Sequence, residues 1–593
     1  MNMVNVTIDD VQVSVPSNFT ILEAARKAGV NIPTLCYMKG INEVGACRVC
    51  LVEVVGGRAL AAACVNPVTD GMIVKTNSNR VRATRRSTLE MILSDHNREC
   101  LSCIRNKNCE LQDLAERYNI REISYEGKKS EPKIDDKSQS IYRDASKCIL
   151  CGRCVAACEK QSIGVLSFLN RGFDTKIGPA YDISMADAPC VYCGQCIIAC
   201  PVGALHEKEE DQRVFDAIND PKKHVVAQVA PAVRAALGEE FGLPMGTRVT
   251  GKMFAALHRM GFDKVYDTNF GADLTIIEEG NELLNRISNG GKLPMITSCS
   301  PGWIRFAEFY YPDFLDNLST CKSPHQMEGA IIKSYYAQKK GIAPEDIFVV
   351  SIMPCTSKKT EASREEMFNP TTGQRDVDAV ITTREFARMI KTAGIDFLKL
   401  PDETPDNDLI GEYSGAAVIF GATGGVMEAA LRTVADILEE QDMPEFEYKT
   451  VRGVGAGIKE AELKIGGHDL RVAVAHSTAA ARKLLDAIRA GTAPEYHFIE
   501  IMGCDGGCVC GGGQPQVKAQ DLMDIDIREL RAKALYEEDE SRAIRKSHQN
   551  PDIVELYKNF LGEANGHLSH ELLHTHYHAR EIYPDSVLAE ENE

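Results

Sequence analysis

The number and spacing of the cysteines constrain this chain more than any other feature. The chain has 593 residues and 21 cysteines, and fifteen of these cysteines lie between Cys36 and Cys200. An odd, clustered set with repeated C-x2-C spacing is typical of metal centres rather than of disulfides. The first third of the chain is therefore expected to hold metal centres.

Length and charge narrow the classes of protein that this chain can belong to. A length of 593 residues predicts several domains, roughly three to five, and 44% hydrophobic with 26% charged residues is ordinary globular composition. A net charge of -18 argues against nucleic acid or an anionic membrane as a partner. No signal peptide is visible and no run of 18 apolar residues occurs, so we expect a cytoplasmic protein without membrane insertion.

The first two regions each carry four candidate metal ligands. Residues 1–78 show two runs of alternating valines around Asp9 and Asp10, then a helical run, which is the order of a ferredoxin-like β-grasp domain. Its cysteines are Cys36, Cys47, Cys50 and Cys64, which fit a 2Fe-2S cluster or a four-cysteine zinc site. Residues 79–125 carry His96, Cys100, Cys103 and Cys109, which fit a 4Fe-4S cluster or zinc.

Residues 140–210 contain an internal cysteine repeat, preceded by a polar stretch at 126–145 that is expected to be an exposed linker. The two copies of C-x2-C-x2-C-x3-C consist of Cys148, Cys151, Cys154 and Cys158, and of Cys190, Cys193, Cys196 and Cys200. This is the pattern of two-cluster 4Fe-4S ferredoxins, in which the fourth cysteine of each copy binds the other cluster. Cys158 is therefore expected to join the second copy, and Cys200 the first.

Cysteines are rare in residues 211–520, and the pattern of this region predicts an α/β domain. Apolar runs at 225–229, 295–297, 347–351, 379–381 and 417–419 alternate with helical segments, so loops after buried strands should carry the site. Residues 521–593 are charged and helical, and we expect their end to be a solvated, partner-facing helix rather than a metal site. The histidines of this end are His567, His570, His574, His576 and His578.

Three short segments in the second half each combine cysteine with Gly or Pro. They read TSCSPGW at 297–303, MPCTSKKTE at 353–361 and EIMGCDGGCVCGGGQP at 500–515. Such loops, coming from separate elements, are what a buried cluster site needs. Together the three segments resemble the signature segments of the FeFe hydrogenase catalytic domain, and the resemblance extends over about residues 1–575. The first 210 residues resemble the longer hydrogenases of this family and the large iron-sulfur subunit of respiratory complex I.

The resemblance implies an enzyme of anaerobic hydrogen metabolism that reversibly oxidises H2. Its expected cofactors are an H-cluster, in which a 4Fe-4S cluster is joined to a two-iron unit with CO, cyanide and dithiolate, plus one 2Fe-2S and three accessory 4Fe-4S clusters. The resemblance implies that Cys355, Cys504 and Cys508 are ligands of the H-cluster, and that Cys508 bridges to the two-iron unit. It also implies that Lys358 donates a hydrogen bond to an iron-bound cyanide. The other cofactor-binding positions that it implies are Pro231, Met353, Glu361, Met502 and Gln514.

The first segment departs from the family pattern, which usually has two adjacent cysteines. Here Ser300 stands in place of the second cysteine. Matched position by position to the family segment, Cys299 is the proton-relay thiol and the Ser300 oxygen is the fourth ligand of the 4Fe-4S subcluster. In the alternative, a local shift makes Cys299 the ligand. Ala232 and His325 also differ from the serine and glutamine that are common in the family, so we expect altered hydrogen bonding to cyanide.

A proton route is expected on one face of a helix. Glu279, Glu282 and Arg286 are spaced i, i+3 and i+7, which places them on the same side. The resemblance combines them with Ser319 and Cys299 into a relay from the cofactor to the surface. A cysteine thiol suits the inner end because its ordinary pKa, about 8.5, is close to neutral.

The sequence does not determine the redox partner with which this chain exchanges electrons. No Gly-rich dinucleotide motif follows a strand, so we expect NAD(P) and flavin to bind to complex I-like partner subunits. We extend this expectation to a complex that bifurcates electrons between NAD(P) and ferredoxin. The alternatives are a stand-alone ferredoxin-dependent hydrogenase, a complex I-like electron-transfer subunit, and a sensory or non-catalytic relative.

Overall fold

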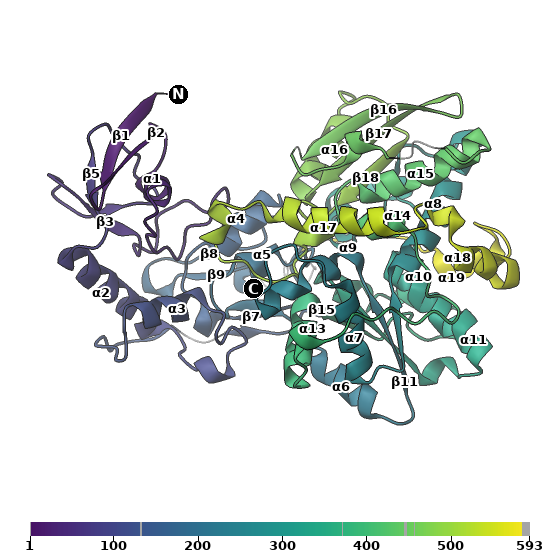
Figure 1. Cartoon of the computed structure of the whole chain (residues 1–593), viewed down its shortest axis with the longest axis horizontal. Coiled ribbons are helices and arrows are strands. Elements are labelled where there is room, and N and C mark those ends of the chain that lie inside the picture. Colours follow the sequence, from purple (N-terminus) through teal and green to yellow (C-terminus); the bar gives the residue numbers. More distant parts are fainter. Residues whose placement is uncertain (1, 131–132, 371, 444–446, 456, 584–593) are drawn as a thin grey trace, which may run out of the picture.

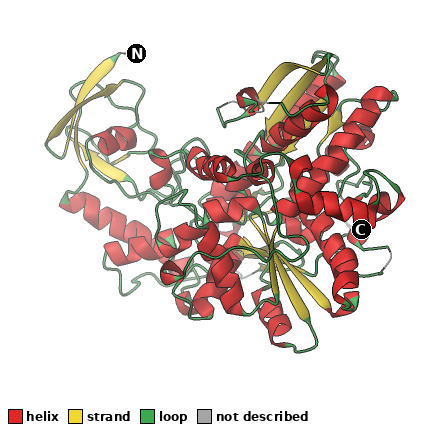
Figure 2. Ribbon diagram, turned by 45° about the vertical axis from the view of Figure 1, so that its right-hand side comes forward, coloured by secondary structure: helices red, strands yellow, loops and turns green. Residues whose placement is uncertain are grey.

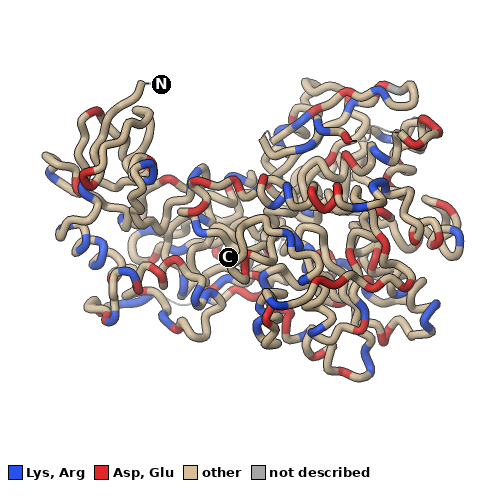
Figure 3. Tube along the Cα trace, in the orientation of Figure 1, with Lys and Arg blue, Asp and Glu red and all other residues tan. Residues whose placement is uncertain are grey.

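The structure is a computed structural model of the whole chain, and it describes residues 2–130, 133–370, 372–443, 447–455 and 457–583. The iron-sulfur regions extend to one side of a large α/β body, and the last helices run back across that body (Figure 1). Basic and acidic residues are interspersed along the chain trace (Figure 3). Among the described residues, no helix combines the length and apolarity that crossing a bilayer requires.

The N-terminal region has the predicted hairpin, helix and cysteine-loop order. The hairpin turns at Asp9 and Asp10, which both have positive φ, and Thr20 with Glu23 forms a capping box at the start of the helix. The sheet order is β2-β1-β5-β3-β4. The elements are β1 Met3–Ile8, β2 Val11–Pro16, α1 Ile21–Lys27, β3 Leu51–Val54, β4 Ala61–Ala62 and β5 Ile73–Lys75.

The next two regions are built mainly from short helices and cysteine loops. His96 ends helix α2, and Gly152 and Gly194 adopt the same left-handed conformation at the start of α4 and α5, as expected for a repeat. The helices are α2 Asn79–Asp95, α3 Glu110–Arg117, α4 Arg153–Lys160 and α5 Gln195–Ala199. The strands are β6 Ile134–Asp135, β7 Ile141–Asp144, β8 Ser167–Leu169, β9 Lys176–Gly178 and β10 Leu205–Glu207.

The prediction of an exposed linker over 126–145 is wrong in its second half. Strands β6 and β7 form a three-stranded sheet with β10, and the side chains of Ile141 and Arg143 are buried. These strands are too short to show a period, and the partner strand β10 lies about 60 residues further along the chain. Residues 131–132 of the predicted linker lie outside the described residues.

The catalytic region contains two four-stranded sheets with helices around them (Figure 2). The first sheet is fully parallel, in the order β12-β11-β14-β15, and the second has the order β13-β18-β17-β16 with β16 antiparallel. The strands are β11 His224–Val229, β12 Lys264–Asp267, β13 Met295–Ile296, β14 Ile347–Met353, β15 Ala379–Thr382, β16 Ile458–Ile465, β17 His468–His476 and β18 Phe498–Met502.

The helices of this region cover both sheets and confirm the predicted α/β class. They are α6 Asp211–Asn219, α7 Thr250–Met260, α8 Asn269–Ser288, α9 Pro301–Tyr310, α10 Pro324–Ile331, α11 Ala337–Lys340, α12 Ser357–Glu361, α13 Thr383–Thr392, α14 Gly415–Val418, α15 Gly425–Glu439 and α16 Thr478–Arg489. The prediction of a strand at 417–419 is wrong, because this run lies in α14 and the turn after it. Ser414 caps α14 by accepting from the Ala417 N–H, and an apolar run buried on all sides cannot be told from a strand by its period.

The C-terminal region is helical, as predicted, and lies against the catalytic body. It consists of α17 Ile527–Ser541, α18 Pro551–Leu556 and α19 His567–Leu573. Its end is not wholly a solvated helix, because Leu572, Leu573 and His574 are buried while the other four histidines are exposed. Apolar and hydrogen-bonded contacts with residues some 250 positions earlier bury them, which composition alone does not show. Residues 584–593 lie outside the described residues.

Candidate active site and cluster sites

The three cysteine segments follow three parallel strand ends, as the sequence predicted. The segment at 297–303 follows β13, that at 353–361 follows β14, and that at 500–515 follows β18. Hydrogen bonds join them: Gly513 N–H donates to Pro354 O at 2.8 Å, and Ile501 N–H donates to Thr297 Oγ1 at 3.1 Å. Loops from both sheets therefore meet at one place.

A cavity lies where these loops meet. Three predicted cofactor-binding residues, Pro231, Met353 and Met502, line it together with Ala232 and His325. The predicted polar residues that line it are Cys299, Cys355, Lys358 and Cys508. Glu361 and Gln514 support the wall from behind, since Glu361 binds Lys358 and the Gln514 amide donates to Ala232 O at 2.9 Å.

Lys358 is a buried cation held at the cavity by two acceptors. Its ammonium donates to Glu361 Oε2 at 2.8 Å and to Cys299 O at 3.1 Å. Burial raises the pKa of Glu361, but Lys358 and then His325 outweigh burial and bring it to about 2. The carboxylate is therefore ionised and fixes the lysine, whose remaining hydrogen is available to a ligand in the cavity.

His325 is neutral and already engaged on both ring nitrogens. Burial first, and Lys358 second, lower its pKa to about 4. Nε2 lies 2.6 Å from Glu361 Oε2 and Nδ1 lies 3.1 Å from Ser351 Oγ. Because the ionised carboxylate needs the single N–H, Nδ1 accepts from the serine, and no ring N–H is left for the cavity.

Cys299 and Ser300 face different surroundings. Cys299 lines the cavity. Ser300 Oγ accepts from Gly503 N–H at 3.2 Å, one residue before Cys504. Burial raises the pKa of Cys299 well above its ordinary range, and Glu279 is the neighbour whose charge adds most to the rise. The assignment of Cys299 as relay and Ser300 as ligand stays a prediction, and the raised pKa of Cys299 departs from the near-neutral thiol that the sequence analysis expected.

The predicted relay residues form a row along and beside α8 that hydrogen bonds join only at its outer end, since both Glu279 side-chain oxygens are buried without a hydrogen-bond partner. Glu279, Glu282 and Arg286 lie on α8; Ser319 Oγ donates to Glu282 Oε2 at 3.1 Å, and Arg286 Nη2 donates to Glu282 Oε1 at 2.5 Å. Burial raises the pKa of Glu279 to about 8, and the charge of Glu282 adds to the rise. A carboxyl group with this pKa can both accept and release a proton near neutral pH.

The first cysteine set suits an iron-sulfur cluster chemically. All 21 cysteines are described and none is in a disulfide. Cys50 Sγ lies 3.3 Å from Cys64 Sγ, and Cys36 Sγ accepts from Cys47 N–H at 3.4 Å. Four thiols gathered without a disulfide form the donor set that a 2Fe-2S cluster needs.

The two ferredoxin-type sets are also gathered, and the His96 set contains an unpaired ligand atom. His96 Nδ1 is buried without a hydrogen-bond partner, as expected of a nitrogen reserved for a metal. Cys200 lines a cavity with Cys148, Cys151 and Cys154. Burial raises the pKa of Cys190 to about 12, and the neighbouring Cys158 adds to the rise, so each fourth cysteine lies with the other copy.

The ferredoxin-like region contacts the catalytic loops directly. Thr356 Oγ1 and Ser357 Oγ, directly after Cys355, donate to Tyr192 O at 2.7 Å and Val191 O at 2.6 Å, directly before Cys193. A Cβ on Gly512 would lie 2.2 Å from Cys193 O, so this approach requires glycine. The second cluster site therefore lies next to the predicted H-cluster loops.

Sequence reasoning missed several residues around the site. The Gln195 amide donates to Cys504 Sγ at 3.5 Å, and Glu278, Cys321 and His574 lie beside Glu282. Gln195 stands inside a cysteine motif, which draws attention to the thiols alone. Contacts of His574 with α8 join positions nearly 300 residues apart and leave no local signal.

The fold and site define a multi-cluster iron-sulfur oxidoreductase. Residues 223–512 match the family described as "Iron only hydrogenase large subunit, C-terminal domain", and residues 525–580 match "Iron hydrogenase small subunit". The chain belongs to the FeFe hydrogenases, and it is an iron hydrogenase with an H-cluster and iron-sulfur relay domains. Further matches are a 2Fe-2S binding domain at 1–79, an NADH-ubiquinone oxidoreductase-G iron-sulfur binding region at 85–124 and a 4Fe-4S dicluster domain at 147–204.

Individual relatives cover nearly the whole chain. The NADP-reducing hydrogenase subunit HndD of Solidesulfovibrio fructosivorans is 50% identical over 98% of this chain and all of its own length. Iron hydrogenase 1 of Clostridium pasteurianum is 47% identical over 97% of this chain and 100% of its own. The solved structure of HydA1 from Chlamydomonas reinhardtii is 43% identical, covers 63% of this chain and 100% of its own, and has a TM-score of 0.56.

Proposed function

We propose that this hydrogenase oxidises H2 reversibly at an H-cluster bound by Ser300, Cys355, Cys504 and Cys508, with Cys508 as the bridge. The observation that carries this assignment is the single cavity in which loops after β13, β14 and β18 converge. When bound, the H-cluster supplies the redox chemistry that splits or forms H2. Lys358, held by Glu361, would donate to a cyanide of this cofactor, and Pro231, Met353, Met502 and Gln514 would shape the wall around it.

Protons leave along Cys299, Glu279, Ser319, Glu282 and Arg286. Cys299 lines the cavity, and Glu279 is buried beside it with a pKa of about 8. Glu282 and Arg286 carry the route to the half-exposed end of α8. The presence of all five residues, together with Lys358, argues against a sensory or non-catalytic relative.

Electrons travel through one 2Fe-2S and three accessory 4Fe-4S clusters. The proposed ligand sets are the four cysteines from Cys36 to Cys64, His96 with Cys100, Cys103 and Cys109, and the two exchanged ferredoxin sets. The contact between the Cys193 and Cys355 loops supports electron transfer between the cluster of Cys193 and the H-cluster. The domain division at 78, 125, 210 and 520 is part of the same proposal.

The electron partner is a flavin-containing, NAD(P)-linked subunit of the complex I type. Two comparisons support this proposal: the relative HndD is named an NADP-reducing hydrogenase subunit, and residues 85–124 match an NADH-ubiquinone oxidoreductase-G region. The chain works in the cytoplasm under this proposal. The alternative is a stand-alone enzyme that uses ferredoxin.

Affinity purification of the tagged chain from its native cells tests the partner. We expect a flavoprotein to copurify and the eluate to reduce NAD(P) with H2. Recovery of the 65.2 kDa chain alone, reducing ferredoxin directly and never NAD(P), would reject the complex. An eluate that contains the flavoprotein but needs ferredoxin together with NAD(P) would support bifurcation.

A further inference from the structure

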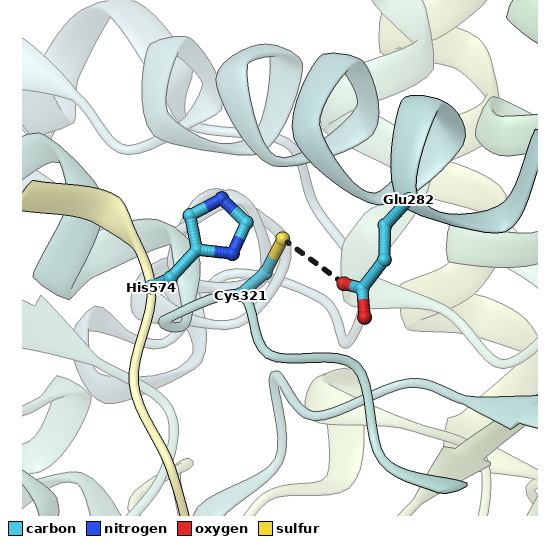
Figure 4. A group of neighbouring side chains, drawn as sticks. All are labelled: Glu282, Cys321 and His574. Atoms are coloured by element: carbon cyan, nitrogen blue, oxygen red, sulfur yellow. Dashed lines mark hydrogen bonds between the residues drawn. The ribbon is translucent and has the colours of Figure 1, made fainter. Parts of the chain in front are cut away.

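Glu282, Cys321 and His574 bring three different metal-binding groups together beside the proton route. One ligand atom from each of the three lies within 4.8 Å of the others, and Cys321 Sγ is 4.0 Å from Glu282 Oε2 (Figure 4). All three residues are buried. Ligand atoms around a tetrahedral zinc ion lie roughly 3.2–3.8 Å apart, so a small inward shift completes three corners of a site.

The backbone holds two of these ligands side by side. Cys321 and His574 face each other across an isolated antiparallel bridge. Lys322 N–H donates to Leu573 O at 2.8 Å, and Thr575 N–H donates to Thr320 O at 2.7 Å. The C-terminal region thus supplies a histidine to a site whose other ligands belong to the catalytic region.

His574 is oriented as a metal-binding histidine is. Its Nε2 lies 3.1 Å from Glu278 Oε2. A carboxylate that accepts from Nε2 places the ring proton on that nitrogen and leaves Nδ1 as the acceptor nitrogen, which is the carboxylate–histidine–metal arrangement.

Acidic groups dominate the centre of the cluster. Glu278, Glu279 and Glu282 surround Cys321, and Arg286 is the cation paired with Glu282. Thr320 Oγ1 lies 2.7 Å from His574 Nδ1, while Glu282 Oε2 accepts from Ser319 Oγ and from Thr320 N–H, both at 3.1 Å. A bound cation would replace the Thr320 hydroxyl at Nδ1 and offset the negative charge.

We propose that Glu282, Cys321 and His574 bind a zinc-class divalent cation, which blocks the outward proton route. A thiolate, an imidazole and a carboxylate suit Zn²⁺ rather than Mg²⁺ or Ca²⁺. The block rests on the proposed relay, because a Glu282 oxygen that binds the cation no longer exchanges a proton. The cation thereby inhibits H2 evolution and H2 oxidation alike, without displacing the H-cluster.

Zinc K-edge X-ray absorption on the loaded holoenzyme tests the site directly. With one equivalent of Zn²⁺ we expect one sulfur at about 2.3 Å and nitrogen or oxygen ligands at about 2.0–2.2 Å, with unchanged iron content. In Cys321→Ala the sulfur shell should disappear. A spectrum without sulfur, or the same sulfur shell in Cys321→Ala, would overturn the site.

Turnover with added Zn²⁺ tests the block. We expect inhibition that a chelator reverses, and Cys321→Ala and His574→Gln should raise the half-inhibiting concentration by roughly 10- to 100-fold or more. The matched control is His570→Gln, because His570 is exposed and its ring stacks on His574 at 4.3 Å outside the ligand set. Equal inhibition of all variants, or a zinc–sulfur bond without inhibition, would overturn the block while leaving the hydrogenase function standing. If His574→Gln does not fold, Cys321→Ala carries the test.

Discussion

Arg286 Nη2 donates to Glu282 Oε1 at 2.5 Å, one turn along α8, at the half-exposed end of the row that begins with Glu279. The guanidinium holds the outer carboxylate in place but leaves the inner one without a cation. Burial raises the pKa of Glu279 to about 8, and the charge of Glu282 adds to the rise. Two carboxyl groups on one helix are thus set for different steps of proton transfer.

Replacement of Glu279 tests the inner step. Glu279→Gln should lower turnover by roughly 10²–10⁴-fold, because the amide cannot pass a proton, while Glu279→Asp should retain part of it. The folded pKa lies above the ordinary value, so this group favours the fold at low pH and loses that contribution as the pH rises through about 8. The melting temperature of the wild type should therefore fall more between pH 6 and 9 than that of Glu279→Gln. Equal turnover and equal pH dependence would remove Glu279 from the route.

Replacing Cys299 and replacing Ser300 should impair different properties of the enzyme. Cys299→Ala should keep the infrared bands of CO and cyanide while cutting turnover by about 10²–10⁴-fold. Ser300→Ala should instead weaken the 4Fe-4S subcluster, and Ser300→Cys should retain it with a shifted potential. Iron content, infrared spectra and turnover are measured together. Loss of the subcluster in Cys299→Ala would make Cys299 the ligand and contradict the position-by-position assignment.

The cluster nearest the catalytic loops should carry electrons without shaping the H2 site. Cys193→Ser should lose one relay cluster and lower dye-linked turnover, while hydrogen/deuterium exchange, which needs no electron exit, persists. The control is Cys510→Ser, which alters a thiol in the third segment outside the proposed ligand sets. A simultaneous loss of exchange and turnover in Cys193→Ser would show that the region is needed for structure.

A buried ion network should make the C-terminal region essential for stability. Arg432 on α15 is fully buried and contacts Glu428 at 2.7 Å and Asp539 of α17 at 2.8 Å. Arg432→Ala removes the buried arginine that these two carboxylates share, while Arg452 stays on Glu428 and Arg545 on Asp539, and it should destabilise the protein by about 3 kcal/mol. The exposed ion pair of Arg489 with Asp313 offers a control, since Arg489→Ala should cost under about 1 kcal/mol. Thermal melts of both variants compare the two, and equal melting temperatures would contradict this role.

Local patterns predicted the parts of the fold and site that local chemistry determines. The hairpin around Asp9 and Asp10 and the strand before Cys355 follow from valine-rich runs and turn residues, and the three loops follow from Gly and Pro next to cysteine. The run at 417–419 could not be assigned, because residues buried on every side carry no helical period. Strands β6 and β7 were missed because two to four residues are too few to show alternation.

Long-range contacts account for the remaining differences. His574 is buried by bonds to Thr320 and Glu278, residues more than 250 positions away, although a His-rich tail indicates a solvated segment. His325 directs its ring nitrogens to Ser351 and Glu361, and no local motif links these two residues to it. Such pairings depend on how the two sheets come together and are not encoded in spacing.

Infrared spectroscopy of the fully matured protein tests the central claim most directly. The account predicts bands of iron-bound CO and cyanide that change between H2 and argon, and a Lys358→Ala variant in which the cyanide bands shift or the two-iron unit is lost, because the ammonium donor is gone. A protein with its iron-sulfur clusters in place but no CO or cyanide bands would contradict the assignment of Ser300, Cys355, Cys504 and Cys508 as an H-cluster site.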